Sequence, residues 1–77
     1  MYRDRIIEII KETFSLKEDF MVEDSMRPND IVEWDSLGHM NLIGRLEEEF
    51  KVNFEFNEII EFDSVANIVK VLERKLG

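Results

Sequence analysis

The sequence has no cysteine and a single histidine, His39, among its 77 residues. Disulfide bonds and thiolate metal sites are therefore excluded, and so is a metal site built from several histidines. Carboxylates alone could hold a cation, but the chain has no Asp-x-Asp-x-Asp-Gly loop of the calcium-binding kind. We expect no metal ion.

Long hydrophobic runs are also missing. No apolar stretch approaches the ~20 residues that a membrane-spanning helix needs, so we expect no membrane insertion. The first segment, MYRDRIIEIIKETF, mixes acids with bases and has no small-residue cleavage motif, so we expect neither a signal peptide nor a transit peptide. The length predicts one small domain over residues 1–77, and the default location is the cytoplasm.

Positive charge is scarce. The chain has 18 acidic and 10 basic residues and a net charge of −8. Residues 33–63 contain nine acids and two bases, so that segment holds −7 of the −8. This balance argues against binding to nucleic acid or anionic membranes and favours basic partners.

Apolar residues recur at helical spacing in three long segments and one short one. We expect helices over residues 2–16, 35–50, 58–61 and 64–76, with Asn57 and Ser64 as N-caps of the last two. No period holds between residues 17 and 35, where Pro28 also forbids a helix. The prediction is an all-α four-helix bundle, with three main helices, one short helix and a long loop between the first and second helices. The expected core stripes are Ile6, Ile7, Ile10 and Phe14; His39, Leu42, Ile43, Leu46 and Phe50; and Val65, Ile68, Val69, Leu72 and Leu76.

The dipeptide Asp-Ser occurs three times. We interpret Asp24-Ser25 as a turn and Asp63-Ser64 as a helix cap. Asp35-Ser36 also begins a helix, but Leu37 and Met40 form an apolar pair beside it, and an acidic run follows on the same helix. At a helix N-terminus the free N–H groups favour an attached anion. A serine that is modified, with Asp35 as the cap, fits this position.

Catalysis by the chain itself is not expected. Ser36 has His39 at i+3, but nothing evident in the sequence orients that histidine as a base, and no Gly-x-Ser-x-Gly elbow is present. Leu46 and Phe50 bracket the acids of residues 47–49 as core residues, so we expect those acids to project into water rather than to act as a catalytic pair.

These residues resemble the acyl carrier protein family over most of the chain. The resemblance rests on Asp35-Ser36-Leu37 at the start of the second helix, followed by Asn41-Leu42-Ile43 and Leu46-Glu47-Glu48-Glu49-Phe50. It implies that Ser36, flanked by Asp35 and Leu37, receives 4′-phosphopantetheine from coenzyme A by a phosphopantetheinyl transferase. It also implies a monomeric shuttle that carries acyl thioesters, is not an enzyme, and docks on basic patches of acyl-transferring or acyl-modifying enzymes.

The resemblance also assigns surfaces. The docking candidates are Leu37, Met40, Asn41, Gly44, Glu47 and Glu48. The candidates for an acyl pocket are His39, Ile43, Leu46 and Ile59.

The chain departs from the pattern of many fatty-acid carriers around its serine. Gly38 and Asn41 stand where acids are common, and Gly44 and Arg45 where apolar and small residues are usual. These differences favour a dedicated carrier in one specialised pathway as much as one in general fatty acid or polyketide synthesis. An aminoacyl carrier, such as a D-alanyl carrier, stays open, and so does a non-carrier acidic adaptor in which Ser36 only caps a helix.

Overall fold

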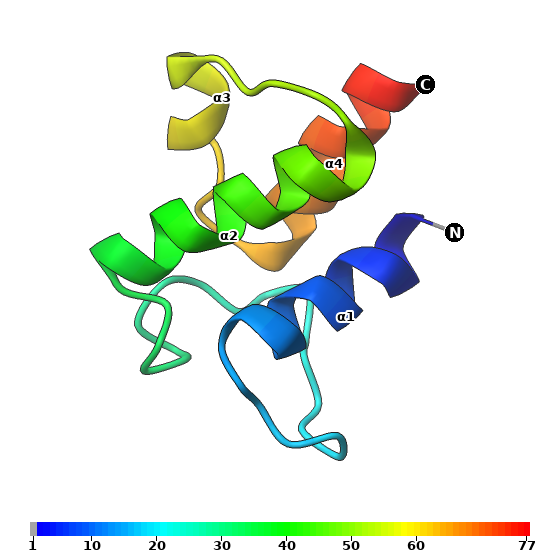
Figure 1. The fold of residues 1–77 in the computed structure, drawn as a ribbon. Helices are drawn as coiled ribbons and strands as arrows, with labels where there is room; N and C mark the ends of the chain where they lie inside the picture. The colour runs from blue at the N-terminus through cyan, green and yellow to red at the C-terminus, as the bar shows by residue number, and fades with distance from the viewer. Residues whose placement is uncertain (1) are drawn as a thin grey trace.

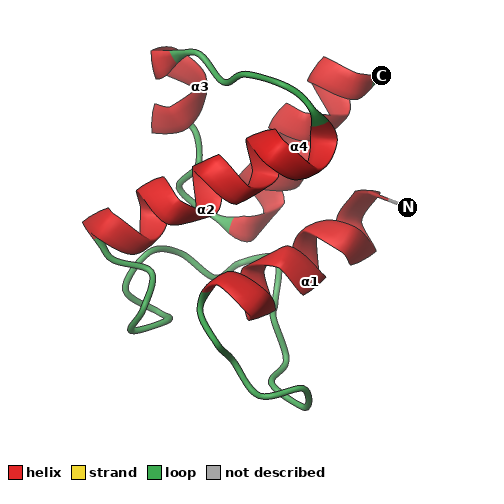
Figure 2. Ribbon diagram, in the orientation of Figure 1, coloured by secondary structure: helices red, strands yellow, loops and turns green. Residues whose placement is uncertain are grey.

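The computed structural model describes residues 2–77 and consists of helices and loops, with no β-strand in that range (Figure 1 and Figure 2). The helices are α1 (Tyr2–Thr13), α2 (Ser36–Phe50), α3 (Phe56–Ile60) and α4 (Val65–Leu76). The predicted all-α bundle of three main helices and one short helix, with a long loop after the first, is confirmed. No helix in the described part of the chain is both long and apolar enough to span a bilayer.

The first helix ends earlier than predicted. It stops at Thr13 rather than at Leu16, because Ser15 adopts a left-handed backbone with φ of 53°. The Leu16 N–H then turns back and donates to the Lys11 carbonyl at 2.9 Å, which satisfies an orphan group of the last turn. Helix α2 ends in the same way at Lys51, with φ of 55°.

The short helix was misplaced. Asn57 is not its N-cap: α3 begins at Phe56, and Glu55 precedes it. The Glu58 carboxylate accepts a hydrogen bond from the Glu55 N–H at 2.8 Å, so the acid three residues into the helix closes its first turn. The Ser64 cap of α4 is confirmed, because its hydroxyl accepts from the Asn67 N–H at 3.2 Å.

The core lies where α1 packs against α2 and α4. The predicted stripes supply most of the core, although Ile7, His39, Phe50 and Leu76 are only partly buried. Ile9 and Val71 are buried core residues that the stripes did not include. The long loop contributes as well, with Val22, Ile31 and Trp34.

The loop is also tied to the start of α4. The carbonyls of Asp24 and Met26 accept from the Ala66 and Val65 N–H groups, both at 2.9 Å. These bonds satisfy two of the N–H groups that have no partner within α4.

Candidate functional site

Asp35 is the N-cap of α2, and Ser36 is the first residue of that helix. Asp35 has an extended backbone, and its Oδ1 accepts from the Gly38 N–H at 2.8 Å. The predicted capping role of Asp35 is therefore confirmed. Because the aspartate fills this role, the exposed Ser36 is not needed to cap the helix.

The other two Asp-Ser pairs differ in this respect. Asp24-Ser25 lies in a turn of the long loop, as predicted. In Asp63-Ser64 the serine hydroxyl itself caps α4. Of the three serines, Ser36 alone stands exposed on a helix N-terminus that another side chain caps.

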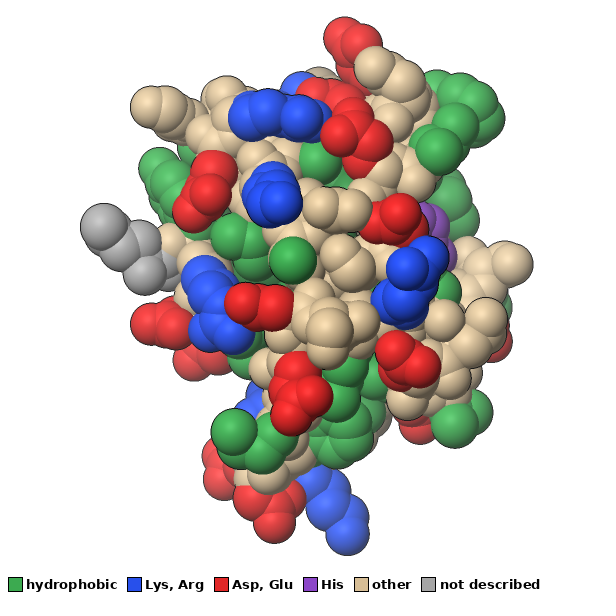
Figure 3. Space-filling model, turned by 180° about the vertical axis from the view of Figure 1, so that it is seen from behind, with side chains coloured by type: hydrophobic (Ala, Val, Ile, Leu, Met, Phe, Trp, Pro, Cys, Tyr) green, Lys and Arg blue, Asp and Glu red, His purple; other side chains and the backbone are tan. Residues whose placement is uncertain are grey.

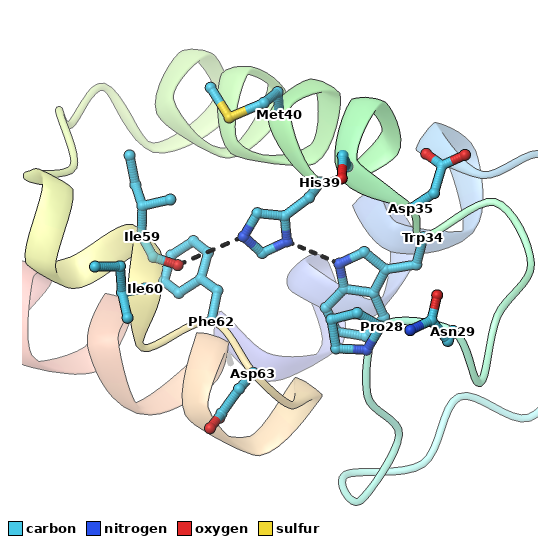
Figure 4. Close-up of a pocket in the computed structure, with 11 residues that line it drawn as sticks. Pro28, Asn29, Trp34, Asp35, His39, Met40, Ile59, Ile60, Phe62 and Asp63 are labelled. Atoms are coloured by element: carbon cyan, nitrogen blue, oxygen red, sulfur yellow. Dashed lines mark hydrogen bonds between the residues drawn. The ribbon is translucent and has the colours of Figure 1, made fainter.

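An open hollow of about 540 Å³ lies beside Ser36 (Figure 4). It is formed by the end of the long loop, the first turn of α2 and the segment from α3 to the start of α4. Its lining residues are Pro28, Asn29, Trp34, Asp35, Ser36, His39, Met40, Ile59, Ile60, Phe62 and Asp63. This is within the size range of small-ligand sites, and its walls are mainly apolar with a few polar groups.

His39 is held in a fixed orientation, which the sequence did not indicate. The Trp34 Nε1–H donates to His39 Nδ1 at 2.9 Å, and His39 Nε2 lies 3.4 Å from the Ile59 carbonyl oxygen (Figure 4). Nδ1 must therefore be an acceptor, which places the proton of the neutral ring on Nε2, facing Ile59. Both ring nitrogens have partners other than Ser36, so this arrangement does not supply a base for the serine.

The acyl-pocket candidates divide into two pairs. His39 and Ile59 line the hollow. Ile43 and Leu46 do not line it, because they lie in the core with exposures of 3% and 0%.

Most docking candidates lie on the outer surface of α2. Leu37 and Met40 expose 72% and 56% of their surface. Asn41, Gly44 and Glu48 are exposed too. Glu47 differs, because it is half-buried and its Oε2 accepts from the Phe54 N–H at 2.9 Å, which ties the loop after α2 to the helix.

Two exposed apolar residues of α3 were missed. Phe56 and Ile60 expose 77% and 63% of their surface, and Ile60, like Met40, lines the hollow. Their i, i+4 spacing places them on one face of α3, and that spacing was the available sequence signal. They extend the apolar surface around the hollow from α2 onto α3.

Several charged side chains on and near α2 form ion pairs. Arg5 pairs with Glu49 at 2.9 Å and lowers the pKa of that carboxyl, while Arg45 pairs with Glu12 at 2.8 Å. Glu48 forms no ion pair with another described residue. The rear face of the molecule also shows basic side chains among acidic ones, without a block of one sign (Figure 3).

No cluster of three or more potential metal ligands occurs among residues 2–77. The site that remains is an exposed serine on a helix N-terminus beside an apolar hollow. Such an arrangement can hold a covalently attached anionic group and shelter part of it.

Comparison with known proteins identifies that class of site. The sequence model of the family described as "Phosphopantetheine attachment site" matches residues 4–72. Among solved structures, the holo acyl carrier protein from Geobacter metallireducens, determined by NMR in solution, is 31% identical and superposes with a TM-score of 0.86. The match covers 96% of this chain and 84% of that one. No curated protein sequence matches this chain significantly.

The chain belongs to the acyl carrier protein family of phosphopantetheine-bearing carriers. Its cofactor is covalently attached 4′-phosphopantetheine, and its role is that of an acyl carrier. Carriers of this family work with a phosphopantetheinyl transferase and with partner enzymes, and they are generally not enzymes themselves.

Proposed function

We propose that Ser36 is the attachment point of the prosthetic group and that residues 1–77 form one carrier domain. The proposal rests on the different roles of Asp35 and Ser36 at the start of α2. Asp35 caps the helix through the Gly38 N–H, so the Ser36 hydroxyl is exposed and available for modification.

The surroundings of Ser36 fit a phosphodiester. The first N–H groups of a helix have no acceptor within the helix, and they carry the positive end of its dipole. A phosphate bound to Ser36 Oγ would lie at this end of α2. The hollow beside Ser36 has room for part of the arm, whose thiol holds acyl groups as thioesters.

The transfer itself balances without a catalytic residue in this chain. A bond forms between Ser36 Oγ and the phosphorus of coenzyme A that bears the pantetheine, and the pyrophosphate P–O bond at that phosphorus breaks. Adenosine 3′,5′-bisphosphate leaves, and the hydroxyl proton passes to a base of the transferase. This chain contributes the exposed hydroxyl and the capped helix that positions it.

The docking surface that we propose consists of Leu37, Met40, Asn41, Gly44 and Glu48 on α2, extended by Phe56 and Ile60 on α3. Apolar residues at its centre and an acid at its edge suit a basic enzyme surface with an apolar patch. Glu47 is placed outside this surface, because its carboxylate already binds the Phe54 N–H. The pathway that we propose is a specialised one, served by a dedicated carrier that acts as a monomer.

The test is intact-mass measurement after incubation with coenzyme A and a broad-specificity phosphopantetheinyl transferase. We expect the wild-type chain, and the Ser25→Ala and Ser64→Ala variants, to gain one phosphopantetheine. Ser36→Ala should gain none while remaining folded, since Asp35 keeps the cap and the cost stays below about 1 kcal/mol. Modification of Ser36→Ala, or no gain on folded and unmodified wild-type protein, would refute the proposal and favour an acidic adaptor.

A further inference from the structure

Most polar side chains in the lining of the hollow already have hydrogen-bond partners. Both ring nitrogens of His39 have one, and one of these partners is the Trp34 N–H. Asp35 caps α2, and the Asp63 carboxylate accepts from the side-chain amide of Asn67. These four lining residues are therefore engaged within the fold.

Asn29 is the lining residue whose polar side chain is not engaged in this way. It lies on the loop side of the hollow, beside Pro28 and Trp34 (Figure 4). Its side-chain amide forms no hydrogen bond with any other residue in the range 2–77. Its backbone N–H donates to the Trp34 carbonyl at 3.3 Å. This bond holds Asn29 beside the residue that directly precedes Asp35 and Ser36.

The backbone of Asn29 does not account for the amide. The residue has φ of 84°, in the left-handed region that asparagine and glycine tolerate best. Glycine adopts this conformation more readily still, because it has no Cβ. The conformation therefore requires a residue of this kind, but it leaves the side-chain amide without a role inside the chain.

The arm of the prosthetic group offers a complement to that amide. Close to its phosphate, 4′-phosphopantetheine has a hydroxyl on the carbon next to an amide carbonyl. The hydroxyl donates a hydrogen bond and the carbonyl accepts one, whereas an asparagine amide presents a donor, Nδ2–H, beside an acceptor, Oδ1. The carboxylates of Asp35 and Asp63 can only accept, and their charge repels the phosphate.

On the basis of the proposed function, we infer that Asn29 binds the hydroxyl and first amide carbonyl of the arm. Asn29 Nδ2–H donates to the carbonyl oxygen, and Oδ1 accepts from the hydroxyl. The arm is thereby held against the loop side of the hollow while the carrier is free of partners. Because Asn29 is exposed, water competes for its amide, and the bond is weak enough for a partner enzyme to withdraw the arm.

The test is NMR spectroscopy of the holo protein, prepared with the transferase from coenzyme A whose pantetheine is isotope-labelled. The measured quantities are the Asn29 Nδ2–H chemical shifts before and after attachment and the order parameters of the two arm amides. A hydrogen bond of this kind should raise the ratio of bound to free arm by about 2- to 12-fold. We expect the Asn29 signals to shift and the amide nearer the phosphate to be clearly more ordered than the amide nearer the thiol.

Three variants separate this bond from a general effect of the loop. Asn29→Gly keeps the left-handed backbone and removes the amide, and Asn29→Asp keeps the shape but replaces the donor with a charged acceptor. In both, the order of the first arm amide should fall to that of the second. Asn57→Ala removes an exposed amide that does not line the hollow, so the arm should behave as in wild type.

Circular dichroism of the apo forms checks that each variant is folded, and the wild-type shift of the Asn29 signals is decisive even if a variant is not. If the wild-type chain gains no phosphopantetheine by mass, the proposed function fails and this inference with it. If the arm is attached but the Asn29 signals do not move, or Asn29→Gly leaves the order of the arm unchanged, Ser36 remains the attachment point and the inference about Asn29 is wrong.

Discussion

Replacing Gly38 by alanine should destabilise the fold, although alanine is the better helix former. A Cβ built on Gly38 lies 1.9 Å from the Glu33 carbonyl oxygen and 3.1 Å from the Phe14 Cε1. The loop backbone would have to retreat by at least about 1.5 Å to reach ordinary contact distance. Because Glu33 directly precedes Trp34 and Asp35, that movement would disturb the positions of the buried Trp34 and of the Asp35 cap. Glycine is therefore required here by close packing, since no glycine among residues 2–77 has a positive φ.

The magnitude follows from two opposing effects. Overpacking typically costs about 1–3 kcal/mol, and the gain in helix propensity is at most about 1 kcal/mol. We expect Gly38→Ala to lose about 1–2 kcal/mol of unfolding free energy, or roughly 5–15 °C in Tm for a domain of this size. Urea and thermal unfolding, followed by far-UV circular dichroism and Trp34 fluorescence, measure both quantities.

Gly44 provides a matched control on the same helix. It is exposed, and a Cβ built on it meets nothing within 4 Å. Gly44→Ala should therefore gain up to about 1 kcal/mol from helix propensity alone. If Gly38→Ala proves as stable as wild type, or if both variants shift in the same direction, the reasoning about close packing at Gly38 is refuted.

Three further perturbations test the charges and the buried hydrogen bond. Hydrogen bonds from the Glu55 N–H and from Lys75 lower the pKa of the Glu58 carboxyl from its ordinary value of 4.5. Its charge therefore stabilises the fold above that value, and the contribution is lost as pH falls through the lowered pKa. Acid unfolding of Glu58→Gln should be less steep than that of wild type below about pH 5, and an identical pH profile would contradict this. Trp34→Phe removes the donor to His39 and part of the core volume, so it should cost about 1–3 kcal/mol in urea unfolding, and a loss below a few tenths would show that the bond contributes nothing. Glu48→Lys should leave Tm within about 2 °C of wild type and slow association with the transferase at low salt, whereas Glu47→Lys should lower Tm by releasing the Phe54 N–H. Equal effects of the two on Tm would contradict the separate roles of Glu47 and Glu48.

The helical spacing of apolar residues was sufficient to predict the helices that bury a stripe of apolar side chains. Helix α2 was predicted over residues 35–50 and spans Ser36–Phe50 with Asp35 as its N-cap, and most of the predicted core residues of α1 and α4 are buried. The errors lie at helix ends, where local hydrogen bonding decides at which residue a helix begins or ends. The early end of α1 depends on a left-handed serine, Ser15, which residue type does not indicate. The start of α3 depends on Glu58 reaching back to Glu55, although Asn57 is the better cap by residue preference.

The site could be predicted only where its residues are neighbours in the sequence. Asp35 and Ser36 are adjacent, so the cap and the serine beside it followed from the sequence. The contact between His39 and Ile59 joins residues 20 apart, and the binding of Glu47 to the Phe54 N–H depends on how the chain turns after α2. Neither has a periodic signal. The acyl-pocket candidates Ile43 and Leu46, which the family resemblance supplied, lie in the core and not in the wall of the hollow.

The acidic composition overstates the charge that α2 offers to a partner. Of the three successive acids at residues 47–49, Glu49 is paired with Arg5 and Glu47 is bound to a backbone N–H, so Glu48 is the acid left to the proposed docking surface. Arg45 is also neutralised, by Glu12. One exposed charge interacts weakly across a Debye length of about 10 Å at 0.1 M salt. The greater part of the affinity should then come from Leu37, Met40, Phe56 and Ile60, which are all more than half exposed. Association with a partner should consequently weaken only a few-fold when salt rises tenfold, while Met40→Ala or Phe56→Ala should raise Kd by about tenfold at any salt concentration.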